Sequence, residues 1–551
     1  MKKYIVTVAI LLSLIGCKIE KKEAFSDLKS YFLQGTYNND GTFIKTSITQ
    51  KPNILFIMTD DHAMSAISAY KGFLSEVAPT PNIDRIANDG MRFNNMFCTN
   101  SICGPSRASI LTGKYAHVNG FFKNEGGGDF NGAQQTFPKL LQKAGYETAV
   151  IGKWHLGTAP TGFDYYKVLF NKEGQGSYFD PVFEMANDSI VEEKGKFSTT
   201  VIKEDAINWL KNRKDDKKPF MLMYQFKAPH RPWDPGPGYE AYLSDVTLPY
   251  PATFNDAYKG RKAAKDSWMR IDGHMNRKDV KIKPPSGLTE EELIAWNKYG
   301  NNDGEFWTPD PKMTDQERKN WKYQRYVKDY LRVVKGVDDA IGEMLDHLEK
   351  SGLVENTIIV YTSDQGFYLG EHGWFDKRFM YEESMHMPLL IKYPKKIKAG
   401  SVNNDLILNV DYAPTLLSLA GVETPNDMQG KSFVPVLENK AKAPFRDAVY
   451  YHYYEYPYWH NVQPHYGIRT DRYKLIHYYY DVDEWELFDL EKDSNEMNNI
   501  YNTSENSELV INLKNRLASL KKENKMDMSD DELKKMTDIR IKRRYRVEPA
   551  N

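Results

Sequence analysis

The feature that most constrains the fold of this chain is a repeated alternation of short apolar runs with helical patterns. Asn53–Thr59 is a nearly continuous apolar run, as expected for a strand buried on both faces. Runs at 146–151, 219–226 and 357–362 have the same character. From Val327 to Leu348, apolar residues recur at three- and four-residue steps or their sums, which predicts a long amphipathic helix. The alternation predicts an α/β fold with a doubly wound, mainly parallel sheet.

Two later parts of the chain depart from this alternation. Residues 252–315 are polar and basic and contain Lys-Pro-Pro and Asn-Asn-Asp-Gly turns, which indicates an insertion at the surface. After about residue 440 the apolar segments become short and rich in tyrosine, and residues 509–520 have a helical pattern. We expect a main domain over 51–440, a smaller C-terminal antiparallel sheet with a packed helix over 441–523, and a charged, loosely ordered tail over 524–551.

The N-terminal residues have the pattern of an export signal followed by a tether. Lys2 and Lys3 precede an apolar run, Tyr4–Ile15, that is shorter than the roughly 20 residues a helix needs to cross a bilayer. The run ends Leu-Ile-Gly-Cys17, which resembles a bacterial lipobox, where the cysteine is lipidated. An ordinary cleaved signal with a chance cysteine is the alternative. We expect a lipoprotein signal at 1–17, a tether at 18–50, and an exported protein anchored by lipid to the bacterial (outer) membrane, on its periplasmic or cell-surface side.

Composition excludes several classes of protein. Of the 551 residues, 41% are hydrophobic and 27% are charged, unlike a disordered chain, a collagen or a multi-span membrane protein. The 74 basic and 75 acidic side chains leave a net charge of −1, so no overall field attracts nucleic acid. Three cysteines, Cys17, Cys98 and Cys103, are too few for a disulfide framework. The aromatic content of 13% suits sugar-binding platforms, although aromatic packing in the core is the simpler explanation.

Acidic and amide side chains follow two of the predicted strands at the point where each strand ends. Asp60 and Asp61 come directly after the first strand, and Asp364 and Gln365 follow the strand that starts near residue 357. Ligands of open α/β sheets bind outside the carboxyl ends of the strands, so these four side chains are candidates for one site. Oxygen donors suit Ca²⁺ or Mg²⁺ better than Zn²⁺. A pair of helix N-cap residues is the alternative interpretation of the two aspartates.

Cys103 begins the sequence Cys-Gly-Pro-Ser-Arg, in which Pro105 suits the first turn of a helix. The cysteine is therefore predicted at a helix N-terminus, where free N–H groups and the helix dipole favour anions. Taken alone, this placement indicates either a reactive thiol of low pKa or a buried, inert cysteine.

The segment Cys103–Arg107, followed by Ala-Ser-Ile-Leu-Thr-Gly, resembles the signature of the type I sulfatases, and the resemblance extends over residues 51–499. The Asp-Asp and Ser-Asp-x-Gly sequences stand in the family's order. The resemblance implies an alkaline-phosphatase-like fold and a formylglycine (3-oxoalanine) made from Cys103 by a formylglycine-generating or anaerobic maturation enzyme. It also implies one Ca²⁺ ion with five ligands: Asp60, Asp61, Cys103, Asp364 and Gln365. Many members have asparagine where Gln365 stands, and glutamine keeps the amide oxygen on a longer arm.

The resemblance also implies roles for five further residues. Arg107 would hold the hydrated aldehyde. In the sequence Gly-Lys-Trp-His, Lys153 would bind sulfate and His155 would orient the geminal diol, one hydroxyl of which attacks sulfur. His230, in Ala-Pro-His-Arg-Pro, would protonate the leaving sugar oxygen, and Lys377 would be a second sulfate ligand. Without the resemblance, each lysine is an ordinary surface charge and each histidine a structural residue.

For the substrate, residues 373–388 and 450–480 are similar to those of bacterial polysaccharide sulfatases, among them N-acetylglucosamine-6-sulfatases and ulvan-active sulfatases. This similarity implies a sulfuric ester hydrolase that removes O-sulfate from a sulfated polysaccharide or its oligosaccharides. A marine algal polysaccharide such as ulvan is the expected source, and a glycosaminoglycan-type N-acetylglucosamine-6-sulfatase is the alternative. A phosphatase of the same superfamily and a non-catalytic glycan-binding lipoprotein are more distant alternatives. Substrate contacts are expected at His460, His465 and Arg469, with core or surface placement as the alternative for each.

Overall fold

The structure, a computed structural model, describes residues 35–37, 43–45, 51–124, 130–170, 175–276, 278–281, 289–290, 312–457 and 460–541. Two compact units are present, Met1–Lys51 and Pro52–Asn551. In the first unit, β1 (Gly35–Tyr37) and β2 (Phe43–Lys45) form a short antiparallel pair. The predicted signal peptide and most of the predicted tether lie outside the described residues. None of the described helices is both long and apolar enough to cross a bilayer.

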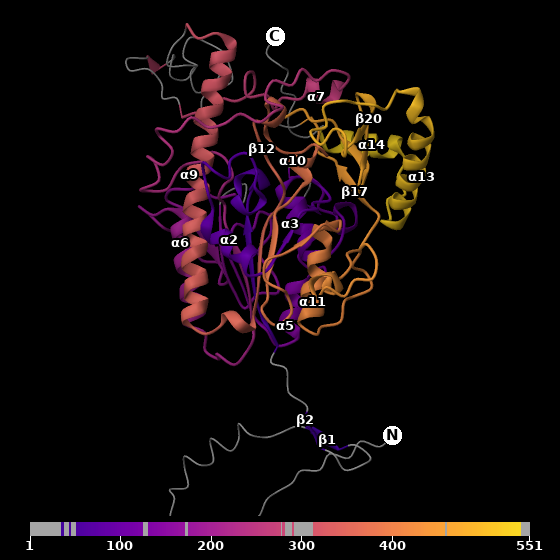
Figure 1. Ribbon diagram of the computed structural model, residues 1–551. Helices are drawn as coiled ribbons and strands as arrows, with labels where there is room; N and C mark the ends of the chain where they lie inside the picture. The colour runs from indigo at the N-terminus through magenta and orange to yellow at the C-terminus, as the bar shows by residue number, and fades with distance from the viewer. Residues whose placement is uncertain are drawn as a thin grey trace, which may run out of the picture. The chain divides into compact units, whose positions relative to one another are not determined.

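A mixed, mainly parallel sheet forms the centre of the second unit (Figure 1). Within the described residues its strands are, in spatial order, β15 (Ser401–Asn403), β4 (Met91–Phe93), β14 (Leu389–Lys392), β11 (Thr357–Ser363), β3 (Asn53–Thr59), β10 (Phe220–Gln225), β6 (Glu147–Gly152), β7 (Tyr165–Leu169), β8 (Val182–Met185) and β9 (Ile190–Glu192). The five strands from β11 to β7 are parallel, whereas β14 and β8 run antiparallel to their neighbours. The predicted sheet is confirmed, and it contains all four predicted strands.

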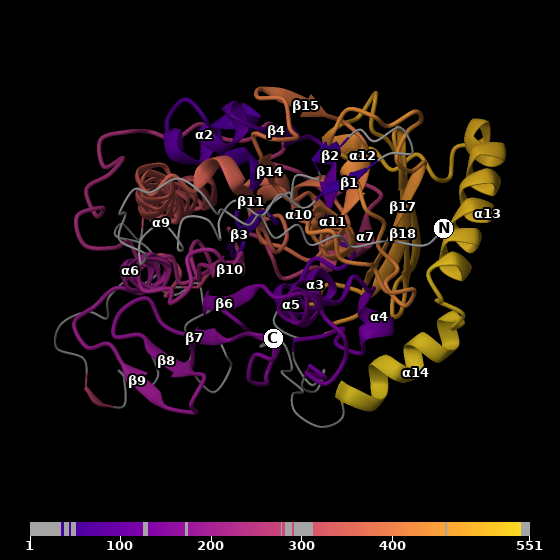
Figure 2. The same cartoon turned by 90° about the horizontal axis from the view of Figure 1, so that it is seen from below.

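Helices cover both faces of this sheet, as Figure 2 shows. One face carries α2 (Pro81–Asn88), α6 (Ser198–Lys211) and α9 (Asp315–Lys350), and the other carries α3 (Cys103–Thr112), α5 (Phe137–Lys143) and α11 (Tyr412–Leu419). Because β3 is buried on both faces, its side chains alternate between two cores: Ile54, Phe56 and Met58 face α3, and Leu55 and Ile57 face α9. The long predicted helix lies within α9, which begins with a capping box of Thr314 and Glu317.

The C-terminal part contains the predicted antiparallel sheet and its helix. The strands are β17 (Ala448–Tyr453), β18 (His465–Thr470), β19 (Tyr473–Tyr479) and β20 (Asp483–Asp489), followed by α13 (Ser507–Glu523). The described part of the tail differs from the expected loose order, because α14 (Asp530–Ile541) follows α13. Leu533 of α14 is fully buried, and Tyr466 of β18 donates a hydrogen bond of 2.9 Å to Asp530. One apolar anchor and one polar anchor therefore hold this charged helix.

The predicted surface insertion is wrong for its described part. Met269 and Ile271 are fully buried, and the main chain around them pairs with the loop that carries Lys377, through Phe375 N to Met269 O (3.0 Å) and Ile271 N to Gly373 O (2.9 Å). A polar composition concealed this because few apolar residues are enough to anchor an irregular segment.

The remaining short elements are α4 (Ala116–Asn119), α7 (Lys262–Asp266), α10 (Glu382–Met385), α12 (Val434–Leu437), β5 (Met96–Phe97), β12 (Tyr368–Leu369), β13 (Phe375–Asp376), β16 (Ile407–Leu408) and 3₁₀ turns at 64–66, 68–70, 354–356, 371–373, 409–411 and 504–506.

Candidate active site

The four predicted oxygen donors meet at the carboxyl edge of the central sheet. Strands β3 and β11 are parallel neighbours with Thr59 opposite Ser363, so the residues that follow them emerge side by side. The backbone N–H of Asp61 donates to Asp364 Oδ1 at 3.2 Å. Carboxylate oxygens of Asp60, Asp61 and Asp364 all lie within 4.8 Å of one another, and all three residues are buried. The predicted convergence of these side chains is thus observed.

These residues fit a hard divalent cation. Asp60 Oδ1 and Gln365 Oε1 are buried without a hydrogen-bond partner in the described part of the chain. The amide nitrogen of Gln365 donates to Asp61, which turns its oxygen away from that bond. Burial raises the pKa of Asp61 to about 7, against the effect of Lys377, and burial together with Asp60 raises the pKa of Asp364 to about 6. Three crowded carboxylates and one unbonded amide oxygen are a donor set that Ca²⁺ would stabilise.

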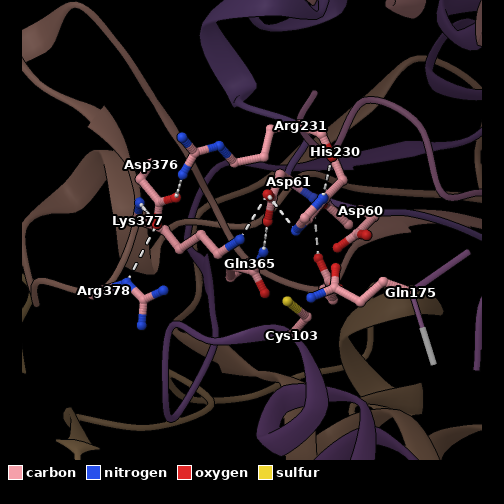
Figure 3. Close-up of polar contacts among 12 residues, drawn as sticks. Asp60, Asp61, Cys103, Gln175, His230, Arg231, Gln365, Asp376, Lys377 and Arg378 are labelled. Atoms are coloured by element: carbon pink, nitrogen blue, oxygen red, sulfur yellow. Dashed lines mark hydrogen bonds and ion pairs between the residues drawn. The ribbon is translucent and has the colours of Figure 1, made fainter. Parts of the chain in front are cut away.

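Three basic side chains pair with the three carboxylates, and Figure 3 shows one of these pairs, Lys377 with Asp61. Lys153 Nζ contacts Asp60, Lys377 Nζ lies 2.7 Å from Asp61 Oδ2, and Arg107 Nε lies 2.9 Å from Asp364 Oδ2. Burial would raise the pKa of Asp60, but Lys153 and the other nearby positive charges outweigh it and hold that pKa well below its usual range. Burial would likewise lower the pKa of Lys377, but the carboxylates led by Asp61 raise it. The pocket therefore holds charged lysines beside the predicted cation ligands.

The position of Lys153 depends on a glycine. Lys153 follows β6, and its backbone N–H donates to Gln225 O of β10 at 2.9 Å. At Gly152 the backbone has φ +111°, and a Cβ atom there would lie 1.7 Å from Gln225 O. Only glycine allows the two strands to approach so closely, and the next residue then points into the pocket.

Cys103 is the first residue of α3 and points into the same pocket (Figure 3). Its Sγ forms a potential ligand group with Asp60 and His230. Burial raises the pKa of the thiol to about 11, although Lys377 and Lys153 act in the opposite direction. Of the two interpretations of this cysteine, burial therefore favours the buried thiol over the thiol of low pKa. Asn124 lies beside it, with Nδ2 3.8 Å from Sγ and Oδ1 accepting from Gly104 N at 3.1 Å.

Both predicted histidines lie in the pocket as neutral rings. His230 Nε2 is 3.7 Å from Asp61 Oδ2, and its Nδ1 is 2.7 Å from Arg231 O. His155 has φ +58°, and its Nδ1 is buried without a partner among the described residues. Burial, followed by the charge of Lys153, lowers the pKa of each ring well below its usual value. A bound anion would favour protonation of either ring.

Of the three expected substrate contacts, His465 and Arg469 are buried behind this pocket, and His460 borders it through Asp376. His465 is fully buried, with Nε2 accepting from Met380 N (3.0 Å) and Nδ1 next to Gln463 O (2.7 Å). Arg469 is buried and pairs with Glu382 at 3.2 Å. His460 lies 3.1 Å from both Asp376 and Trp268 O, so both ring nitrogens are occupied. The core alternative holds for all three, because β18 and its flanking loop pack against the main domain.

Several polar residues of the pocket were not predicted from the sequence. Asp376 accepts from Lys377 N at 2.9 Å and lies 3.3 Å from Arg378 Nε and 3.8 Å from Arg231 NH1. Gln175 accepts from Lys153 Nζ at 3.3 Å. Asp376 and Arg378 have φ values of +79° and +111°, which are unusual for such residues. Only one feature of the sequence indicates that these residues belong to the pocket, which is their position next to predicted site residues. Asp376 and Arg378 flank Lys377, and Arg231 follows His230 directly.

Comparison with known proteins agrees with this geometry. The sulfatase family model matches residues 52–422, and a model described as N-sulphoglucosamine sulphohydrolase, C-terminal, matches residues 370–523. An N-acetylglucosamine-6-O-sulfatase of Bacteroides thetaiotaomicron is 49% identical over 508 residues, covering 88% of each chain. An ulvan-active sulfatase of Formosa agariphila is 27% identical over 436 residues, covering 77% of this chain and 72% of that protein.

One solved structure is similar over nearly its whole length. It is a complex with its substrate, D-glucosamine-2-N,6-O-disulfate, and it is 48% identical with a TM-score of 0.80, covering 87% of this chain and 99% of that one. Both sequence and fold therefore align with sulfatases across the central sheet, the pocket and the C-terminal sheet. This chain belongs to the sulfatase family and is a sulfatase.

Proposed function

We propose that this sulfatase removes the 6-O-sulfate from glucosamine residues of a sulfated glycan of the glycosaminoglycan type, using a formylglycine made from Cys103 and a bound Ca²⁺ ion. The observation that carries this proposal is the placement of Cys103 at the mouth of the sheet, in one pocket with three carboxylates and two lysines. The substrate follows from the high identity to an N-acetylglucosamine-6-O-sulfatase. The identity to the ulvan-active sulfatase is much lower, so ulvan is the weaker candidate.

The cation would be held by Asp60, Asp61, Asp364, Gln365 and the modified residue 103. The support is the set of close carboxylates and the two unbonded buried oxygens. A bound Ca²⁺ supplies positive charge that offsets the charge of the sulfate oxygens and favours ionisation of a hydroxyl next to it. An oxidised, hydrated residue 103 supplies one hydroxyl for attack on sulfur and a second for the later release of sulfate.

The other residues of the pocket bind the ester and move its protons. The ammonium groups of Lys153 and Lys377 lie in the pocket and would stabilise the sulfate oxygens as the S–O bond breaks. His230 would give a proton to the leaving sugar oxygen. The pKa of this ring is lowered without substrate, so the negative charge of the bound sulfate must raise it enough for the ring to be protonated. His155 would accept a proton at residue 103, and Arg107, fixed by Asp364, would hold that residue in place.

The cellular setting belongs to the same proposal. Cys103 requires a maturation enzyme, and residues 1–17 would export the chain and leave it anchored by lipid at Cys17. Export would bring the pocket to glycans outside the cytoplasm.

The test is release of sulfate by protein purified from a host that matures sulfatases. We expect release from N-acetylglucosamine-6-O-sulfate and none from ulvan oligosaccharides. Mass spectrometry of the peptide containing residue 103 should show a fraction of aldehyde that correlates with specific activity across preparations. Hydrolysis of ulvan alone, or full activity with an unmodified cysteine, would contradict the proposal.

A further inference from the structure

One basic residue of the pocket was not predicted to take part in binding. Lys227 follows β10 by two residues, and β10 lies between β3 and β6 in the sheet. The adjacent Ala228 carbonyl accepts from Asp60 N at 3.2 Å, and Phe226 N donates to Met58 O at 2.8 Å. Lys227 therefore leaves the same sheet edge as Asp60 and Lys153. Its side chain is only 3% exposed.

Lys227 differs from the other cations of the pocket because it has no counterion. Lys153, Lys377 and Arg107 each contact a carboxylate. The ammonium of Lys227 instead lies over the ring of Tyr178, 5.3 Å from its centre, and no hydrogen bond or ion pair to it occurs within the described residues. Tyr178 is itself fixed, since its hydroxyl donates to His230 O at 2.6 Å. A ring face gives far less stabilisation than a carboxylate.

The numbers of positive and negative side chains in the pocket also leave one cation without a counterion. Four cationic side chains, Lys153, Lys227, Lys377 and Arg107, lie near three carboxylates, Asp60, Asp61 and Asp364. Burial lowers the pKa of Lys227 to about 8, with Lys153 acting in the same direction. A buried ammonium that keeps no protein counterion is suited to an anion that arrives with the substrate.

The neighbours of Lys227 indicate which anion this is. The charges that act most strongly on Lys227 are those of Lys153, Asp60, Asp61 and Cys103, which lie around the predicted nucleophile. Arg231 and Arg378 instead pair with Asp376 in another part of the pocket. We propose that Lys227 binds an oxygen of the sulfate group that is being hydrolysed, as a third ammonium beside Lys153 and Lys377. This inference rests on the proposed sulfate ester chemistry and assigns one further residue to it.

Two substrates and two variants test this assignment. With N-acetylglucosamine-6-O-sulfate and with D-glucosamine-2-N,6-O-disulfate, Lys227→Met should lower kcat/KM by a similar factor, about 100-fold, the typical effect of losing one positioned charge donor. Lys227→Arg should recover part of this loss. The inhibition constant of inorganic sulfate should rise at least about tenfold in Lys227→Met, because the same oxygen contact is lost. A loss confined to the disulfated sugar, or unchanged inhibition by sulfate, would overturn the proposal.

A stability measurement separates binding from a structural role. Since Lys227→Met removes an unpaired buried charge and keeps the apolar stem, its Tm without sulfate should equal or exceed that of the wild type, whereas a structural lysine would give a lower Tm. The matched control is Lys521→Met, which removes another lysine that lies over a ring, 4.3 Å from the centre of Tyr466, and should leave the kinetics unchanged. If the wild type hydrolyses neither sugar, the proposed substrate is wrong. Stabilisation by inorganic sulfate in wild type but not in Lys227→Met then still decides the role of Lys227.

Discussion

At the scale of the residue, the pocket concentrates ionisable groups that protein interiors normally avoid. Asp60, Asp61 and Asp364 are fully or almost fully buried, and their carboxylates crowd one another. Positive side chains offset this repulsion only in part, because the pKa values of Asp61 and Asp364 stay raised. An arrangement this unfavourable persists where a cation or substrate completes it.

Calcium should therefore stabilise the protein through these carboxylates. After treatment with EDTA, adding Ca²⁺ to about 100 times its Kd should raise the free energy of unfolding by about 2.7 kcal/mol. Asp61→Asn should abolish most of this gain, since it removes a ligand charge, and thermal unfolding measures the shift. As control, Asp338→Asn replaces a buried aspartate that accepts hydrogen bonds from Asn82 N and Ile83 N at the start of α2, and it should keep the calcium response. An equal response in Asp61→Asn would mean that the ion binds elsewhere.

The two buried cysteines allow a matched test of the nucleophile. Cys103→Ser should reduce turnover by about 10³-fold or more, because a serine sulfate has no second hydroxyl with which to expel sulfate. Cys98→Ser should keep turnover and the modification at residue 103, since the polar contacts of Cys98 Sγ are with Ser101 Oγ (3.2 Å), Met385 O (3.5 Å) and Ser384 O (4.0 Å), none of which is a predicted site residue. Sulfate release over many turnovers is the measurement. Normal multiple turnover in Cys103→Ser would exclude the aldehyde mechanism.

At the scale of the element, parallel strands in register bring the site together. β3 and β11 deliver the carboxylates, β6 delivers Lys153, and the N-terminus of α3 delivers Cys103. The three strands are each anchored in a core on both faces, and α3 is buried in one of these two cores, so the residues at their ends are held in place. The geometry of the pocket therefore depends on strand spacing as much as on the side chains themselves.

Gly152 tests this dependence. Gly152→Ala would place a Cβ against Gln225 O at a positive φ, so β6 and β10 must separate and Lys153 must move. We expect a loss of roughly 3 kcal/mol or more in the free energy of unfolding, together with a large fall in kcat. Gly145→Ala is the control, because Gly145 has φ +94° but a Cβ there would meet nothing within 4 Å, so only backbone strain of about 1 kcal/mol applies. Equal effects of the two substitutions would contradict this dependence.

At the scale of the whole molecule, a buried polar layer joins the C-terminal sheet to the segment at the start of α10. Lys474 of β19 lies 2.7 Å from both Glu382 and Glu496, and Glu486 of β20 accepts from Tyr381 OH at 2.8 Å. Burial raises the pKa of Glu486 to about 8 and that of Glu496 to about 7. The stability of this contact between the C-terminal sheet and the main domain should therefore depend on pH.

The sign of this response follows from proton binding. Between the unfolded pKa of glutamate, about 4.3, and the raised folded values, the folded state binds more protons than the unfolded state, so the free energy of unfolding falls as pH rises. We expect the free energy of unfolding of Glu486→Gln, taken relative to that of the wild type, to increase by about 1–3 kcal/mol from about pH 5 to about pH 8, because the variant lacks this titrating group. Glu532→Gln, at an exposed glutamate whose pKa is lowered by bonds to Ser529, should show no such change relative to the wild type. A difference between Glu486→Gln and the wild type that stays constant over this range would contradict the assignment.

Much of this molecule could be predicted from the sequence because the decisive signals are local. Short, nearly continuous apolar runs are typical of strands buried on both faces, and β3, β6, β10 and β11 are such strands. The site residues Asp60, Cys103 and Lys377 were predicted because they stand in motifs next to strand or helix ends. The C-terminal sheet was predicted from tyrosine-rich segments with turns between them.

What only the tertiary structure decided are the properties that depend on distant neighbours. For His465 and Arg469 the sequence left open substrate contact, core placement and surface placement, and the packing of the C-terminal sheet against the main domain buries them. Likewise the position of Cys103 at a helix start left open a reactive thiol and a buried one, and the surrounding core raises its pKa. Lys227 became a candidate only when every neighbouring cation was seen to have a carboxylate and it did not. Short stretches of chain determine secondary structure and the residues of each motif. Burial, charge pairing and the access of substrate to a side chain depend instead on residues hundreds of positions apart.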